Sequence, residues 1–266
     1  MQLGIITCCY MAGIYNYNVP NDFNWPAMVA KHHAEFGEKD FVKLMRDIKA
    51  LGLDAVEVWA PHANYLALTE KDALRYKKIL DDEGMSCPVY CVGGWGKADT
   101  GVVERGFAFA KALGSHTVNG TMPNDPEQHT PILDVVDKFG NQYGLRYSIE
   151  NHAIPAMEDY MTVRKICDTY SPAIGANLDV GIYYRTGYDV VKAAMELKDR
   201  VYHVHFKDAG ADGKAVPAGE GDAPLKELAA YLQSINYKGM ISIEWEPRID
   251  PSPHLPRAVA YCKTFI

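Results

Sequence analysis

The 266-residue sequence has no long hydrophobic run and no excess of basic residues. No apolar stretch approaches the roughly 20 residues that a membrane-spanning helix needs. The first residues, Met1 to Ile6, lack the basic segment of a signal peptide and predict a strand instead. The chain has 27 Lys and Arg against 34 Asp and Glu, and its net charge of −7 disfavours binding to phosphate backbones. We therefore expect a protein that binds neither membranes nor nucleic acids.

Cysteine is also scarce, and no two cysteines form a Cys-x-x-Cys motif. The six are Cys8, Cys9, Cys87, Cys91, Cys167 and Cys262. Six cysteines in a chain of this length are too few for a disulfide scaffold, and their spacing does not suit a thiolate zinc site. We expect free, buried thiols and a cytoplasmic protein.

What the sequence does contain is a regular alternation of short apolar runs and amphipathic segments of helical length. The predicted strands are Leu3–Cys8, Ala55–Trp59, Cys87–Val92, His116–Asn119, Arg146–Glu150, Ile174–Asp179, Val201–Phe206 and Met240–Trp245. The predicted helices are Asp40–Leu51, Glu70–Glu83, Thr100–Leu113, Glu127–Tyr143, Glu158–Tyr170, Tyr188–Lys198, Ala223–Ile235 and Pro253–Phe265. Each unit averages about 33 residues, which suits a parallel strand and its crossover helix.

Eight such units predict an α/β fold, a (β/α)8 TIM barrel that forms a single domain over residues 1–266. A doubly wound open sheet is the alternative, but eight units close into a barrel without spare elements. The connection from Cys9 to Lys39 is unusually long and rich in aromatic residues. We interpret it as a lid on the catalytic face of the barrel, or as a segment that packs on a neighbouring subunit.

Four successive predicted strands end in residues that can bind a metal ion: Glu150, Asp179, His205 and Glu244. A single carboxylate at a strand end is more often a helix cap or a salt-bridge partner. Four of these groups around one barrel axis would concentrate negative charge, which is costly without a cation. Three carboxylates and one imidazole suit one divalent ion, first Mn²⁺ or Mg²⁺, with Co²⁺ or Zn²⁺ as alternatives.

Several strings carry a resemblance to a known family. They are Asn-Leu-Asp-Val-Gly at 177–181, His-Phe-Lys-Asp at 205–208, Ala-Gly-Glu-Gly-Asp at 218–222, the ending at 237–246 and Gly-Leu-Asp-Ala-Val-Glu-Val-Trp at 52–59. Together they resemble the xylose-isomerase-like TIM-barrel superfamily, and within it the sugar phosphate isomerase/epimerase branch. That branch includes ketose 3-epimerases, hydroxypyruvate isomerases, inosose dehydratases and the catalytic subunits of C-glycoside deglycosidases.

The resemblance implies that the four strand-end residues are the metal ligands, and that Glu150 and Glu244 also move protons on opposite faces of a carbohydrate substrate. His152 would point to the same side of its strand as Glu150 and bind a substrate hydroxyl. Lys207 matches the family's His-x-Lys-Asp and would polarise a carbonyl or neutralise an enediolate. The family is also compatible with a homo-oligomer.

Three further residues are candidates for substrate binding because they lie at or just after the second and third strands. They are Glu57, His62 and Trp95. His62 either enters the site or caps a helix, and Trp95 either stacks on a sugar or packs in the core.

The expected activity is that of a divalent-metal-dependent isomerase or epimerase, which acts on a keto-sugar or polyol ketone through an enediolate. A lyase of the same fold is the alternative, because two positions depart from the pattern that the resemblance to epimerases implies. Ile182 stands in place of their histidine, and Ala211 stands in place of their arginine. A DNA-repair endonuclease of the endonuclease IV type would need more histidines at the early strand ends. A non-catalytic sugar binder would not need the complete ligand quartet.

Overall fold

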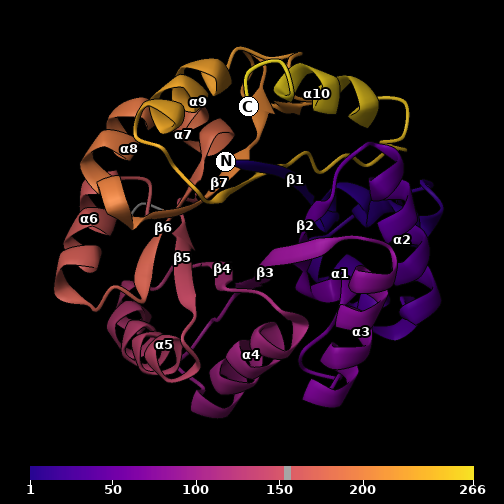
Figure 1. Ribbon diagram of the computed structural model, residues 1–266, viewed down its shortest axis with the longest axis horizontal. Helices are drawn as coiled ribbons and strands as arrows, with labels where there is room; N and C mark the ends of the chain where they lie inside the picture. The colour runs from indigo at the N-terminus through magenta and orange to yellow at the C-terminus, as the bar shows by residue number, and fades with distance from the viewer. Residues whose placement is uncertain (153–156) are drawn as a thin grey trace.

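Eight parallel strands close into a barrel in the computed structural model, which describes residues 1–152 and 157–266 (Figure 1). The barrel strands are β1 (Gln2–Ile6), β2 (Ala55–Trp59), β3 (Ser86–Gly94), β4 (Thr117–Thr121), β5 (Arg146–Glu150), β6 (Ile174–Asp179), β7 (Val201–Phe206) and β10 (Met240–Ile243). β1 closes the ring by pairing in parallel with both β2 and β10. The predicted (β/α)8 barrel is confirmed, and β2, β5, β6 and β7 have the predicted bounds.

The helices form an outer ring around the strands (Figure 1). They are α1 (Trp25–Glu35), α2 (Glu38–Ala50), α3 (Glu70–Asp82), α4 (Thr100–Leu113), α5 (His129–Tyr143), α6 (Tyr160–Thr169), α7 (Val180–Thr186), α8 (Val190–Leu197), α9 (Leu225–Ser234) and α10 (Leu255–Cys262). Local chemistry sets their ends. Thr69 and Asp72 cap α3 reciprocally, and α4 ends at Gly114, whose φ of 95° lies in the left-handed region.

Strand alternation separates two kinds of interior. Side chains such as Val56, Val58 and Val118 are fully buried and belong to the apolar core, which includes residues of the helices. The neighbouring residues in these strands point the other way, into the barrel. Glu57 and Asn119 therefore meet there. The barrel therefore has a polar interior, with functional groups stacked below the carboxyl ends of the strands.

The first connection contains helical elements that the sequence did not predict. It contains a 3-10 helix, η1 (Thr7–Tyr15), and the helix α1. The Asn24 side chain caps α1 by accepting a hydrogen bond from the Ala27 N–H at 2.9 Å. β1 ends early because η1 begins at Thr7, whose hydroxyl accepts a hydrogen bond from the Trp59 N–H at 2.9 Å.

Three smaller elements were also absent from the prediction. They are α7, directly after β6, and the two strands β8 (Asp208–Ala209) and β9 (Ala215–Val216), which form an antiparallel pair. The short 3-10 helices η2 (Ala60–His62), η3 (Pro126–Gln128) and η4 (Lys198–Arg200) complete the described elements.

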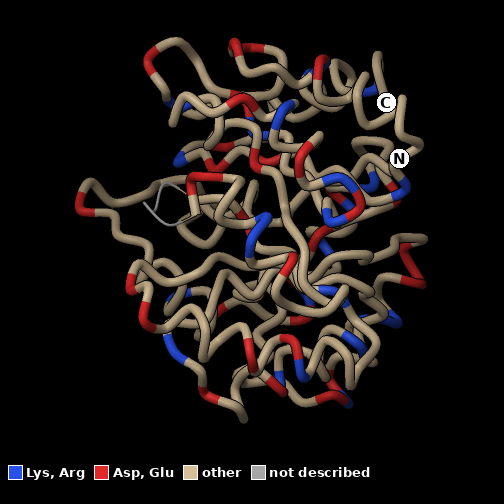
Figure 2. Tube along the Cα trace, turned by 90° about the vertical axis from the view of Figure 1, so that its left-hand side faces the viewer, with Lys and Arg blue, Asp and Glu red and all other residues tan. Residues whose placement is uncertain are grey.

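Surface charge and cysteine chemistry agree with the composition. Acidic and basic residues are interspersed along the chain in Figure 2. The six cysteines are free and buried. Within residues 1–152 and 157–266, no helix has the length and apolar character needed to cross a bilayer.

Candidate metal centre and active site

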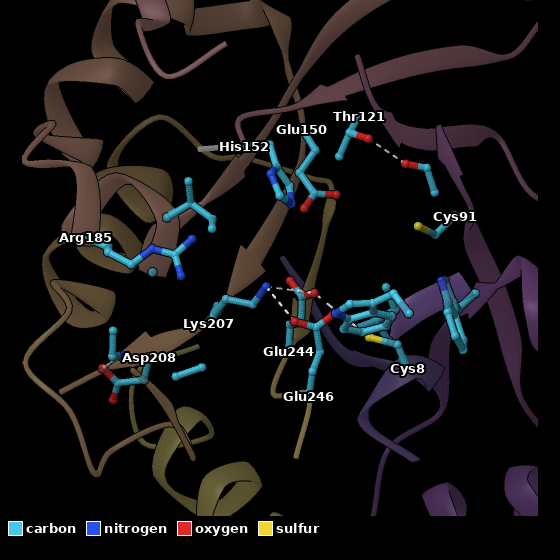
Figure 3. Close-up of a pocket in the computed structure, with 18 of the residues that line it drawn as sticks. Cys8, Cys91, Thr121, Glu150, His152, Arg185, Lys207, Asp208, Glu244 and Glu246 are labelled. Atoms are coloured by element: carbon cyan, nitrogen blue, oxygen red, sulfur yellow. Dashed lines mark hydrogen bonds and ion pairs between the residues drawn. The ribbon is translucent and has the colours of Figure 1, made fainter. Parts of the chain in front are cut away.

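A cavity of about 600 Å³ opens at the carboxyl ends of the barrel strands (Figure 3). Its wall includes Cys8, Glu150, His152, Arg185, Lys207 and Glu244. In TIM barrels this face carries the active site, because the loops that follow the strands meet there.

The four predicted ligands come together beside this cavity, and two of them, Glu150 and Glu244, line it. Glu150 and Asp179 are the last residues of β5 and β6, His205 lies near the end of β7, and Glu244 directly follows β10. One ligand atom from each residue lies within 4.8 Å of the others. All four side chains are buried, and His205 Nδ1 lies 2.7 Å from Glu244 Oε2 and 3.9 Å from Glu150 Oε1.

The polar atoms that meet here indicate that this quartet fits a cation. Asp179 Oδ2, His205 Nδ1 and Glu244 Oε2 are buried and form no well-aligned hydrogen bond with the described residues, although Lys207 Nζ lies 3.2 Å from Asp179 Oδ2 and the other two atoms lie 2.7 Å apart. Buried polar atoms without hydrogen bonds are rare because each is destabilising. Three such atoms converging from carboxylates and an imidazole are the donor set of a hard or borderline divalent ion.

The backbone around Asp179 is held in two ways. Asn151 accepts a hydrogen bond from the Asp179 N–H at 2.7 Å and donates one to its carbonyl at 3.1 Å. Asp179 Oδ1 caps α7 by accepting from the Ile182 N–H at 2.9 Å. One carboxylate oxygen is therefore engaged by the helix, and the other lies 3.2 Å from Lys207 Nζ.

Burial and local charge place the two glutamates in opposite protonation states. Burial raises the pKa of Glu150 to about 8; Glu244 and Asp179 add to this, while His205 opposes it. Burial would also raise the pKa of Glu244, but Lys207 and His205 lower it to about 2. At neutral pH and without a bound ion, Glu150 holds a proton and Glu244 is ionised. Such divergence is how paired carboxyl groups divide acid and base roles.

Lys207 is the buried cation of the site. Its Nζ lies 3.2 Å from Asp179 Oδ2, 3.1 Å from Glu244 Oε1 and 3.1 Å from Glu246 Oε2. Burial would lower the pKa of Lys207, but these carboxylates hold it well above its ordinary value. His152 shares the cavity wall with Lys207, and burial lowers the pKa of its imidazole.

The other three predicted substrate-binding residues do not line the cavity. Glu57 lies below it, inside the barrel, where His203, His205 and Asn119 surround its carboxylate. The geometry therefore gives no support to direct substrate contact by Glu57.

His62 and Trp95 are packed elsewhere. His62 is buried against His32, with ring centroids 4.9 Å apart, and lines a separate cavity of about 430 Å³ beside η1. Trp95 stacks on Tyr147 at 5.6 Å and donates a hydrogen bond to the Tyr65 hydroxyl at 3.0 Å. Both side chains pack against neighbouring aromatic residues in this geometry, and their role in substrate binding stays a prediction.

Sequence reasoning missed several residues of the cavity. Glu246 lies two residues after Glu244. Because alternate residues of a strand point to the same side, the sequence could have predicted that both carboxylates face the cavity. Arg185 lies on the unpredicted helix α7, and its guanidinium points into the cavity in Figure 3. Trp25 of α1 lines the cavity as well, so the first connection contributes an aromatic side chain to its wall.

A parallel barrel with titratable groups gathered at the carboxyl ends of its strands is the architecture of a TIM-barrel enzyme. The chain belongs to the xylose isomerase-like TIM barrel family, whose model matches residues 45–264. The resemblance read from the sequence motifs is thereby confirmed.

Individual relatives are distant. The chain is 26% identical over 143 residues to an inosose dehydratase of Salmonella typhimurium, a match that covers 47% of each protein. The chain thus spans about half the length of this curated relative. Two solved structures share the fold: a probable 3-DHS dehydratase from Bacillus anthracis (TM-score 0.74, 14% identity, 99% of both chains) and a D-psicose 3-epimerase (TM-score 0.73, 16% identity, 100% of this chain and 99% of that chain).

Proposed function

We propose that the protein is a divalent-metal-dependent isomerase or epimerase, which acts on a keto-sugar or related polyol ketone through an enediolate. The observation that carries this proposal is the quartet itself, in which one ligand atom from each of four buried side chains lies within 4.8 Å of the others. The proposed partner is a small carbohydrate, and the proposed ion is Mn²⁺, which accepts this mixed oxygen and nitrogen donor set.

Glu150, Asp179, His205 and Glu244 would hold the ion. When bound, it supplies Lewis-acid polarisation of a substrate carbonyl and so acidifies the neighbouring C–H bond.

The chain's own groups then move the protons. Glu244 removes a proton from the carbon beside the carbonyl, and Glu150 delivers one. Glu150 ends β5 and Glu244 directly follows β10, with β6 and β7 between them around the barrel. Delivery to the opposite face of the same carbon gives an epimer, whereas delivery to the adjacent carbon gives an aldose–ketose isomer. Lys207 stabilises the developing oxyanion, and His152 binds a substrate hydroxyl.

A lyase is the second candidate, and Glu246 is the observation that favours it. Its carboxylate reaches the cavity beside Lys207, and burial raises its pKa. A protonated carboxyl group at this position would serve a departing hydroxyl group as a general acid, which dehydration requires. The similarity to an inosose dehydratase agrees with this alternative.

A proton NMR time course in D₂O separates these reactions. The protein, loaded with diamagnetic Mg²⁺, is incubated with ketoses, an inosose and 3-keto-glucosides. Deuterium at the carbon beside the carbonyl, with the carbon skeleton retained, supports the isomerase or epimerase. A new olefinic signal or a released aglycone supports the lyase. Absence of exchange with every compound, while the protein binds Mg²⁺, would contradict the enediolate mechanism.

A further inference from the structure

We infer that Glu57 is a positioning residue for the candidate metal centre. It holds His205 with Nε2 directed away from the cavity and, through Asn119, fixes the carboxylate of Glu150. The inference rests on the proposed metal dependence. It concerns a buried charge that the proposed proton transfers do not use.

The surroundings of Glu57 are fully occupied. The side chain is inaccessible to solvent, and its Oε2 lies 2.7 Å from His203 Nε2 and 3.0 Å from His205 Nε2. Its Oε1 accepts a hydrogen bond from Asn119 Nδ2 at 3.1 Å. A buried carboxylate with this many partners is held in one orientation.

Glu57, His203 and His205 also lie close enough to be considered a metal site. Their hydrogen bonds argue against it. Each facing atom of this trio forms a hydrogen bond, whereas Asp179 Oδ2, His205 Nδ1 and Glu244 Oε2 of the quartet have only neighbours at ion-pair distance among the described residues. The same test that identifies the quartet as a cation site therefore identifies the trio as its support.

The first contact, between Glu57 and His205, sets the orientation of the His205 imidazole. An ionised carboxylate only accepts hydrogen bonds, so the Nε2 of His205 carries a proton that it donates to Glu57. The other ring nitrogen, Nδ1, then faces the quartet and lies 2.7 Å from Glu244 Oε2. A carboxylate behind a ligating histidine fixes the ring and increases its strength as a ligand.

The second contact connects Glu57 to Glu150 through the side-chain amide of Asn119. Asn119 Nδ2 lies 3.1 Å from Glu57 Oε1 and 3.2 Å from Glu150 Oε2, so its two N–H bonds serve both glutamates. Asn119 Oδ1 accepts a hydrogen bond from the Ser148 hydroxyl at 3.1 Å, which fixes the orientation of the amide. Glu57 thus restrains two of the four candidate ligands from opposite sides.

The substitution Glu57→Gln tests both contacts, the one with His205 and the one with Asn119. Glutamine has the same shape but one acceptor oxygen, so an N–H must face either the histidines or the N–H of Asn119. We expect Mn²⁺ to bind 10- to 100-fold more weakly, as measured by the EPR signal of free Mn²⁺ in titrations of the folded variant. Ser115→Ala is the control, because it removes a buried hydrogen bond to the Cys87 carbonyl just before β4, away from the quartet. The control is expected to keep the wild-type affinity.

A folded Glu57→Gln variant that binds Mn²⁺ within twofold of the wild-type affinity would overturn the inference. If this variant does not fold, long-range ¹H–¹⁵N correlation on histidine-labelled wild-type protein, with and without Mg²⁺, gives the answer. A proton on Nε2 of His205 supports the role of Glu57, and a bare Nε2 refutes it. Wild-type protein that binds no ion would refute the proposed metal dependence, and the same spectrum would still decide what Glu57 does.

Discussion

Replacing Glu244 by Gln removes the proposed base and leaves the shape of the side chain unchanged. In the wild-type protein Glu244 Oε1 lies 3.1 Å from Lys207 Nζ, and Glu244 Oε2 lies 2.7 Å from His205 Nδ1. These neighbours outweigh burial and hold the pKa of Glu244 near 2, so the group is ionised throughout the range in which activity would be measured. Glutamine at this position cannot accept a proton from carbon.

The expected loss follows from the role of a general base. Removing one typically slows a reaction 10²- to 10⁴-fold, or about 3–5 kcal/mol of transition-state stabilisation. Weaker ion binding adds to this loss. We expect the fold to survive, because the variant removes one of several crowded carboxylates. The pKa of Glu150 should fall from about 8, since Glu244 contributes to raising it.

The assay is deuterium exchange into the substrate at saturating Mg²⁺, with thermal unfolding followed by circular dichroism. Glu246→Gln is the matched control, because it makes the same chemical change two residues later. Its carboxylate also lies 3.1 Å from Lys207 but outside the quartet, so an isomerase should retain most of its exchange.

A folded Glu244→Gln variant that keeps more than a tenth of the wild-type exchange rate would refute its assignment as the base. A larger loss in Glu246→Gln than in Glu244→Gln would instead favour the lyase, in which Glu246 protonates the leaving group.

Four further outcomes are expected. Chelation of divalent ions should abolish exchange and lower the melting temperature, and Mn²⁺ at 100 times its dissociation constant should restore about 2.7 kcal/mol of stability; an unchanged melting temperature would argue against the site. Arg185→Gln should raise KM more than it lowers kcat, because the guanidinium lines the cavity on α7, away from the quartet; steady-state kinetics on the substrate found by NMR decides this. Trp95→Phe should leave KM unchanged while lowering stability by about 1–3 kcal/mol, since it removes the hydrogen bond to Tyr65; a raised KM would return Trp95 to the substrate site. Burial and the neighbouring His32 hold the pKa of His62 well below its ordinary value, whereas the unfolded chain binds that proton below about pH 6.5, so stability should fall on acidification. Urea unfolding at pH 7.5 and pH 5 should show a smaller difference in His62→Phe than in wild type, and an equal difference would count against this explanation.

The predicted part of the site consists of residues whose position follows from a local rule. Glu150 and Asp179 end strands, and the carboxyl ends of barrel strands meet on one face, so their convergence could be inferred from the sequence. The network around Glu57 could not be inferred in this way. Glu57 and His203 are 146 residues apart in the sequence, and only the register and closure of the barrel bring them to 2.7 Å.

Trp95 illustrates a second reason why side-chain packing could not be predicted from the sequence. It follows β3 and therefore belongs to the catalytic face, yet the backbone turns just before it. Gly93 and Gly94 have φ values of 78° and 142°, which side-chain-bearing residues rarely adopt, and the indole then packs on Tyr147. The sequence predicted a long first connection, but it did not predict the helix α1 within it. This aromatic segment lacks the regular hydrophobic spacing that indicates a helix.

The two oxygens of Asp179 have a consequence for which residues this position can accept. One oxygen caps α7 and the other belongs to the quartet. Asparagine would keep the cap and lose the charge, whereas glutamate would keep the charge but place it one methylene too far from the helix. The start of helix α7 and the charge of a buried centre therefore depend on the same short side chain, so neither can change independently of the other.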